Sequence, residues 1–337
     1  DAGVPGVDVW AEVLRVLKPG AHLIAFGGTR TFHRLTCAIE DAGFEIRDCL
    51  SWLYGSGFPK SLNLGDGYGT ALKPAWEPAV VAMKPCSGTF AENAIAHGVA
   101  GLNIKGGRLL SSGDGSARDG EASAERRYAD RGVTNFAATP GPRGGSPLGR
   151  WPANVALDEA AAAMLDAQTG ELQSGFMAAG TQREGIGYPG GLGSEVRNDT
   201  HGDKGGASRF FYCAKADRSE RNAGLEGFSS RPLTWSSGKQ NPGTFQSPGT
   251  DRTARNHHPT VKPIDLCRWL ATLLLPPQRE TPRRLLVPFA GSGSEMIGAL
   301  RAGWESVTGI EREPDYCAIA RERIYADAPL LNRTEAG

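Results

Sequence analysis

Apolar positions in the first hundred residues follow two different spacings. Residues 7–17 carry apolar side chains at helical spacing, and a Pro-Gly pair then ends the pattern. Residues 31–43 show the same helical pattern and end at a glycine. Strands are predicted at 21–26, which is short and bounded by glycines, and at 44–53, and the apolar run at 78–83 predicts another strand. The front of the chain is therefore predicted to alternate strands with helices.

The last third of the chain shows the same alternation. Residues 264–275 predict an amphipathic helix, which two prolines end. Strands are predicted at 284–289 and 307–310, and helices at 294–302 and 315–326. Strands that alternate with helices favour the α/β class, here a doubly wound, mostly parallel sheet.

The middle of the chain has a different composition. Of the 46 glycines, 27 fall between 101 and 249, in a stretch that is also rich in Ser, Pro and Asn. Within it, segments such as 111–115 (SSGDG) and 141–147 (GPRGGSP) cannot hold long helices or central strands. We expect a loop-rich insert at 106–204 between two α/β parts, 1–105 and 205–330, and a short tail at 331–337.

The charge and the cysteines exclude several classes of protein. Lys plus Arg and Asp plus Glu both number 37, so the whole chain is not basic. No apolar run reaches the roughly 18 residues of a membrane helix, and no secretory signal opens the chain. The six cysteines form no Cys-x-x-Cys pair, and the Cys and His spacing matches no zinc site. We therefore expect a cytoplasmic protein with no metal site and no membrane partner.

The strand at 284–289 runs into a glycine turn that opens a helix. Gly291 and Gly293 allow a sharp bend and a close approach to a ligand, although a simple tight turn is the plain alternative. Met296 stands where a dinucleotide site needs a small residue, which disfavours NAD and FAD. Glu311 ends the next strand, where an acid accepts hydrogen bonds from a ribose diol or simply caps a helix. Together the turn and the acid favour a nucleoside ligand without a pyrophosphate.

These segments resemble a known family. Residues 289–293 (FAGSG) match the S-adenosylmethionine motif of the DNA methyltransferases that modify adenine at N6 or cytosine at N4. Residues 258–263 (HPTVKP) resemble their second cofactor motif, and 309–316 (GIEREPDY) resemble the acidic strand end. The front matches the same family at three places, namely 15–20 (RVLKPG), 52–60 (WLYGSGFPK) and 72–78 (LKPAWEP).

The resemblance covers about 1–105 and 205–325, and its motif order is that of the beta class, in which the catalytic half precedes the cofactor half. It implies a permuted Rossmann-like fold with S-adenosylmethionine as the cofactor, and it makes 106–204 the target-recognition region. The implied cofactor-binding residues are His258, Pro259, Thr260, Lys262, Phe289, Ala290, Gly291, Ser292, Gly293 and Glu311. Among them, Glu311 would hold the ribose hydroxyls and Lys262 would meet the methionine carboxylate. One departure is Val287, which stands where many members carry an acid.

The family's catalytic motif is missing from the sequence. Its members hold the target amine with Asp, Asn or Ser followed by Pro-Pro and an aromatic residue, and this tetrapeptide does not occur here. In the family it ends the strand just before the helix that matches 7–17. A helix that leads into a parallel strand is normally the crossover from an earlier strand, so the fold pattern also predicts a missing strand. We therefore expect the catalytic motif upstream of Asp1 and no catalytic residue within the sequence.

The implied function is site-specific methylation of double-stranded DNA by direct transfer to a flipped base, as in bacterial or phage restriction-modification. Two alternatives stay open: a methyltransferase of the same fold that acts on RNA, protein or small molecules, and a non-catalytic remnant that binds DNA and cofactor. A homodimer is possible. Two clusters are candidates for phosphate contacts, although such runs are more often solvated faces. They are Arg252, Arg255, His257, His258, Lys262 and Arg268, and Lys204, Arg209, Lys215, Arg218 and Arg221.

Overall fold

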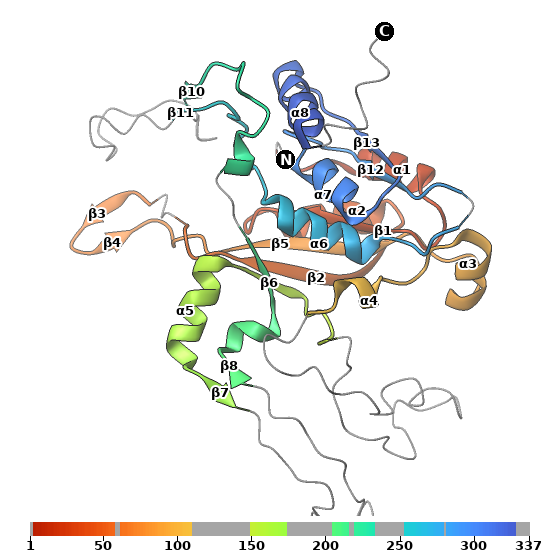
Figure 1. Ribbon diagram of the computed structural model, residues 1–337, viewed down its shortest axis with the longest axis horizontal. Coiled ribbons are helices and arrows are strands. Elements are labelled where there is room, and N and C mark those ends of the chain that lie inside the picture. Colours follow the sequence, from red (N-terminus) through yellow and green to blue (C-terminus); the bar gives the residue numbers. More distant parts are fainter. Residues whose placement is uncertain are drawn as a thin grey trace, which may run out of the picture. The chain divides into compact units, whose positions relative to one another are not determined.

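The computed structural model describes residues 3–57, 61–109, 149–173, 204–215, 219–232, 253–279 and 281–327. Much of the predicted insert and all of the predicted tail lie outside the described residues. The chain divides into two compact units. Figure 1 labels their helices and strands. Unit 1 comprises Asp1–Trp52, Trp76–Gly107 and Ala214–Gly337, and unit 2 comprises Leu53–Ala75 and Arg108–Cys213.

The front part of unit 1 follows the predicted alternation. Its elements are α1 (Val7–Val16), β1 (His22–Phe26), α2 (Phe32–Asp41), β2 (Glu45–Leu53) and β5 (Trp76–Met83). Apolar faces of α1 and α2 pack on β5, and the buried core there consists of Trp10, Val13, Leu35, Ile39, Phe44, Val80 and Ala82. The helical and strand patterns predicted for this part are confirmed.

One strand pairing modifies the expected sheet. The strands lie in the order β1-β5-β2, and β5 runs antiparallel to β1, with His22 opposite Met83. Parallel neighbours need a long crossover, usually a helix, and the stretch between β2 and β5 holds only the short hairpin β3 (Asn63–Gly65) and β4 (Tyr68–Gly69) among its described residues. The α/β class is confirmed, with a mixed sheet.

The rear part of unit 1 holds the second α/β segment. Here β12 (Arg284–Val287) and β13 (Ser306–Gly309) form a parallel pair, with Arg284 opposite Ser306. Three helices accompany them: α6 (Ile264–Leu274), α7 (Ser294–Ala302) and α8 (Pro314–Asp327). A Cβ on Gly298 would lie 2.6 Å from the Cβ of Cys267, so α6 and α7 pack in close contact. The predicted elements of this part are confirmed.

Several elements were not predicted. In unit 2, β6 (Val155–Asp158) leads directly into α5 (Glu159–Thr169), and Asp158 caps that helix by accepting a hydrogen bond from the N–H of Ala161 at 2.7 Å. The sequence pattern gave no prediction for this helix, although residues 159–169 form an alanine-rich run without glycine. The remaining short elements are α3 (Phe90–His97), α4 (Ile104–Gly107), β7 (Leu172–Gln173), β8 (Lys204–Gly205), β9 (Tyr212–Ala214), β10 (Arg231–Pro232), β11 (Thr253–Ala254) and the 3₁₀ turns Ala207–Phe210 and Ser219–Arg221.

Two features are absent from the described residues. None of their helices combines the length and the apolar character needed to cross a membrane. Within the same residues, no group of three His, Cys, Asp or Glu side chains is placed to hold a metal ion.

Candidate cofactor-binding site

The turn between β12 and α7 bends at two glycines. Gly291 has φ +50° and Gly293 has φ +83°, in the left-handed region that side chains disfavour. A Cβ on Gly291 would lie 2.8 Å from Nε2 of His258. A Cβ on Gly293 would lie 3.1 Å from the Cβ of Ala320 in α8. The turn is thus in close contact with both neighbours, and only glycine fits there without a shift.

The carboxylate of Glu311 folds back onto this turn. Its Oε2 accepts a hydrogen bond from the backbone N–H of Gly291 at 2.8 Å. Its Oε1 accepts from the N–H groups of Arg312 at 2.8 Å and Glu313 at 2.9 Å. A carboxylate offers about four acceptor positions, so Oε2 retains capacity for one more donor. Glu311 can therefore hold the turn and accept a ligand hydroxyl at the same time.

Two large apolar side chains are exposed beside Glu311. Phe289 follows β12 and is 54% exposed, and Ile310 follows β13 and is 55% exposed. Because β12 and β13 are parallel, both residues lie at the carboxyl edge of the pair, where α/β sheets bind ligands. The ring of Trp10 meets the ring of Phe289 edge-on, with the centroids 6.0 Å apart. This combination suits a ligand with a flat ring and hydroxyl groups.

His258 closes the turn from the other side. Its ring packs edge-on against Tyr316, with the centroids 4.6 Å apart. Its Nδ1 accepts a hydrogen bond from the N–H of Thr260 at 3.3 Å, so the network assigns the ring proton to Nε2, the atom next to Gly291. Burial lowers the pKa of His258, while the charge of Glu311 opposes this shift. The imidazole is therefore neutral at neutral pH.

Two buried polar side chains donate hydrogen bonds to Ser292. The carbonyl of Ser292 accepts from Nη1 of Arg323 at 2.6 Å. Its hydroxyl lies 3.1 Å from the same Nη1 and 3.1 Å from Nδ2 of Asn256. Ser292, Arg323 and Asn256 are 3%, 2% and 0% exposed. The polar atoms of Ser292 thus connect the turn to α8 and to the segment that precedes His258.

Lys262 lies in an aromatic and acidic environment. Its Nζ is 2.5 Å from Oε2 of Glu77, and the Lys262 side chain is only 8% exposed. The same Nζ lies 4.9 Å from the ring centroid of Phe26 and 5.7 Å from that of Trp52. A buried lysine needs such a counter-charge, because an unpaired ammonium is costly to desolvate. The charge of Lys262 is therefore balanced within unit 1.

Burial also affects an acid at the start of α7. It raises the pKa of Glu295, and the nearby positive charges of Lys262 and Arg323 oppose that shift.

Met296, the next residue, packs closely on β13, because a Cβ on Gly309 would lie 2.3 Å from its Sδ. Met296, whose size argued against a dinucleotide site in the sequence analysis, thus fills the space beside Gly309, which has no side chain.

Among curated proteins, the chain is similar to the type II methyltransferase M.HindIII of Haemophilus influenzae. The two are 32% identical over 116 residues. The aligned residues are 29% of this chain and 38% of that protein. The chain is a distant homologue of a type II methyltransferase. Comparison with known protein families gives no match.

Solved structures provide remote likenesses. The M1.HpyAVI–SAM complex matches 95% of this chain and 85% of its own, with 12% identity and a TM-score of 0.38. A putative DNA modification methylase from Thermus thermophilus, complexed with S-adenosyl-L-methionine, matches 96% of this chain and 76% of its own, with 13% identity and a TM-score of 0.39.

The predicted site residues fall into three groups. The first group forms one turn and contacts it: the turn consists of Phe289, Ala290, Gly291, Ser292 and Gly293, and its contacts are Glu311 and His258. Pro259 and Thr260 lie on the exposed loop beside it, and Lys262 pairs with Glu77 instead. Sequence reasoning missed Glu77, Asn256 and Arg323. The one usable signal was Arg323, an arginine at the helical spacing of Ile319 and Ala320.

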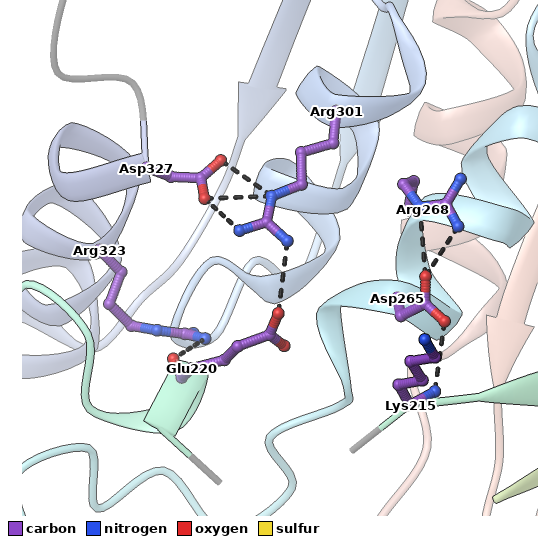
Figure 2. Close-up of polar contacts among 7 residues, drawn as sticks. All are labelled: Lys215, Glu220, Asp265, Arg268, Arg301, Arg323 and Asp327. Atoms are coloured by element: carbon purple, nitrogen blue, oxygen red, sulfur yellow. Dashed lines mark hydrogen bonds and ion pairs between the residues drawn. The ribbon is translucent and has the colours of Figure 1, made fainter. Parts of the chain in front are cut away.

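The two predicted basic clusters are partly neutralised within the chain. In the first, Lys262 pairs with Glu77, and Arg268 lies 2.7 Å from Asp265 (Figure 2). In the second, Lys204 lies 2.9 Å from Glu171. Arg252 and Arg218 are outside the described residues. These clusters therefore give weak support to a phosphate-binding surface.

Proposed function

We propose that this chain binds S-adenosylmethionine at the 288–293 turn. We further propose that it serves in methylation of double-stranded DNA at adenine N6 or cytosine N4. The observation that carries the proposal is the Gly291 turn, whose amide is held by Glu311 beside exposed Phe289. The distant homology to a type II methyltransferase supports the same reaction class.

The residues of the turn fit the parts of this cofactor. Phe289 and Ile310 offer exposed apolar surface for the adenine ring, and the free acceptor position of Glu311 suits a ribose hydroxyl. The neutral imidazole of His258 and the exposed Thr260 would lie toward the methionine end. When bound, S-adenosylmethionine supplies an electrophilic methyl group on its sulfonium, which the target amine takes up directly.

Lys262 has a modified role in this proposal. Because its ammonium pairs with Glu77, we propose that it supports the site by fixing the 258–263 segment against β5. A direct contact of Lys262 with the methionine carboxylate would require Glu77 to share the ammonium. We propose 106–204 as the target-recognition region, following the motif order of the family.

Calorimetric titration with S-adenosylmethionine and S-adenosylhomocysteine tests the cofactor. We expect saturable binding to the wild-type chain and at least about tenfold weaker binding by Glu311→Gln, which changes a charge-assisted acceptor to an amide. Glu313→Gln is the matched control, because this exposed neighbour pairs only with Arg312 in the described structure. Failure of the wild type to bind, or equal affinities for Glu311→Gln and Glu313→Gln, would refute the assignment.

Nucleoside mass spectrometry of DNA from cells that express the chain tests the substrate. N6-methyladenine or N4-methylcytosine, present with the wild type and absent with Glu311→Gln, would support DNA methylation and identify the base. Because the Pro-Pro-aromatic catalytic motif does not occur in this sequence, cofactor binding without a new base leaves the methyl acceptor to a binding test. Failure to bind double-stranded DNA in the presence of S-adenosylhomocysteine would count against DNA and direct the search to RNA, protein or small-molecule acceptors.

A further inference from the structure

A buried arginine lies beneath the glycine turn. Arg323 is in α8 and is 2% exposed, and Ile319 and Ala320 share its buried helix face at i−4 and i−3. Ala320 contacts the turn, because it is the neighbour that leaves no room for a Cβ on Gly293. The same face of α8 therefore brings an apolar contact and a guanidinium to the turn.

The guanidinium donates to several atoms of the turn at once. Nη1 reaches the carbonyl of Ser292 at 2.6 Å, its hydroxyl at 3.1 Å and the hydroxyl of Ser294 at 3.1 Å. Nη2 donates to the carbonyl of Glu220 at 3.2 Å, and Figure 2 shows this bond between α8 and the 219–221 turn. Arg323 thus joins both ends of the Gly293 bend to a second segment of unit 1.

A second arginine binds the same segment at a different place. Arg301, at the end of α7, binds the carboxylates of Glu220 and Asp327, as Figure 2 also shows. Its side chain is 40% exposed. The two arginines therefore share Glu220 as a partner, and Arg323 is the one that binds Ser292 and Ser294 in the described structure.

Burying the guanidinium of Arg323 costs free energy, so this residue is poorly suited to stabilising the fold in general. Burying a guanidinium carries a desolvation penalty that hydrogen bonds only partly offset, and apolar replacements of buried charges are often neutral or stabilising. Within the described part of the chain, its Nε has no hydrogen-bond partner, which adds to that cost. The bonds that it does make are concentrated on the turn, so its contribution lies in holding the turn's conformation.

We propose that Arg323 is a positioning residue for the cofactor turn. By holding Ser292 and Ser294 from beneath, it keeps Gly291 and Gly293 in their left-handed conformations and the Gly291 amide on Glu311. The identity of the ligand rests on the proposed function, whereas the control of the turn by Arg323 does not. Loss of the guanidinium leaves Ser292 with one donor instead of two and frees the bend to relax.

Two measurements test this role in the full chain: calorimetric affinity for S-adenosylmethionine, and hydrogen exchange of a peptide that covers 288–296. The variants are Arg323→Gln, Arg323→Lys and Ser294→Ala, with Arg301→Gln as the matched control. We expect at least about tenfold weaker binding for Arg323→Gln. Arg323→Lys, which keeps the charge and can reach part of the acceptors, and Ser294→Ala should fall between it and the wild type.

The exchange measurement separates a local role from general destabilisation. The samples are compared under conditions in which each variant has the same fraction of folded protein. We then expect faster exchange at 288–296 in Arg323→Gln and an unchanged rate there in Arg301→Gln. Equal affinity and equal exchange for Arg323→Gln and Arg301→Gln would overturn the inference. An affinity of Arg323→Lys for the cofactor as weak as that of Arg323→Gln would also overturn it. If the wild type itself does not bind the cofactor, the proposed ligand fails. Exchange at the turn then decides alone whether Arg323 positions it.

Discussion

The pair formed by Lys262 and Glu77 tests how a buried charge and its partner affect the free energy of unfolding. Glu77→Gln leaves the buried ammonium without its direct counter-charge, and the rings of Phe26 and Trp52 and the nearby carboxyl of Glu295 make no ion pair with it in the described structure. Lys262→Met removes the buried charge instead and leaves Glu77, whose side chain is 29% exposed and can turn to water. We therefore expect Glu77→Gln to be the more destabilising change.

The distance and the burial set the expected size. At 2.5 Å, two unit charges attract by about 7 kcal/mol when the effective dielectric constant is about 20, before desolvation is subtracted. Removing one partner of a fully buried pair costs about 3–5 kcal/mol; the partial exposure of Glu77 reduces our expectation to about 2–3 kcal/mol for Glu77→Gln. Lys262→Met should cost about 1 kcal/mol, because its methylene contacts remain.

Urea unfolding followed by tryptophan fluorescence measures these differences. The double variant Glu77→Gln with Lys262→Met should be more stable than Glu77→Gln alone, because it buries no unpaired charge. Glu313→Gln serves as the control, since its exposed pair with Arg312 should contribute no more than about 1 kcal/mol. Additive effects in the double variant, or a cost for Glu77→Gln as small as that of Glu313→Gln, would refute the reasoning.

Three further predictions concern single positions. Gly291→Ala should weaken cofactor binding by at least about tenfold in calorimetry, because its Cβ would displace the imidazole 2.8 Å away. Gly309→Ala should cost only about 1 kcal/mol in urea unfolding, because Gly309 is exposed and the flexible side chain of Met296, whose sulfur would lie 2.3 Å from the new Cβ, must shift; Met296→Ala should recover part of that cost. Burial, with the charge of Arg47, lowers the pKa of His22 from 6.5 to about 4. Below pH 6.5 the unfolded chain gains a proton that the folded chain does not, so stability should fall by about 3 kcal/mol as the pH drops to 4.

Each of these predictions has a matched comparison. Gly303 also has a left-handed φ, +98°, but its nearest atom for a Cβ is 3.9 Å away, so Gly303→Ala should strain the backbone without weakening binding. Equal losses of affinity at Gly291 and Gly303 would reject the steric argument. Failure of Met296→Ala to recover stability would reject the overpacking. For His22→Val, urea unfolding between about pH 7 and about pH 4.5 should show a shallower slope than the wild type, and an unchanged slope would contradict the assignment.

Local patterns predicted the longer helices and strands of unit 1, although not α3 and α4, because the forces behind such elements are local. A helix such as α1 and a strand such as β1 bury one face against a core, and that burial fixes the spacing of their apolar residues. The helix α5 was missed although Asp158 before an alanine run is a helix start, because the glycine content of its surroundings dominated the interpretation. The antiparallel β5 was not evident, because apolar spacing in a strand carries no direction.

The same distinction divides the candidate site. Short motifs were enough to predict the glycine turn and the acid after the next strand, because their geometry depends on a few adjacent residues. The groups that hold these motifs became visible only in the folded chain: Asn256 and Arg323 reach Ser292 across 36 and 31 residues, and Glu77 reaches Lys262 across 185. A buried charge or amide must find its partners wherever the fold brings them. Pairings over such separations leave no periodic trace in a single sequence, so they appear only when the chain is folded.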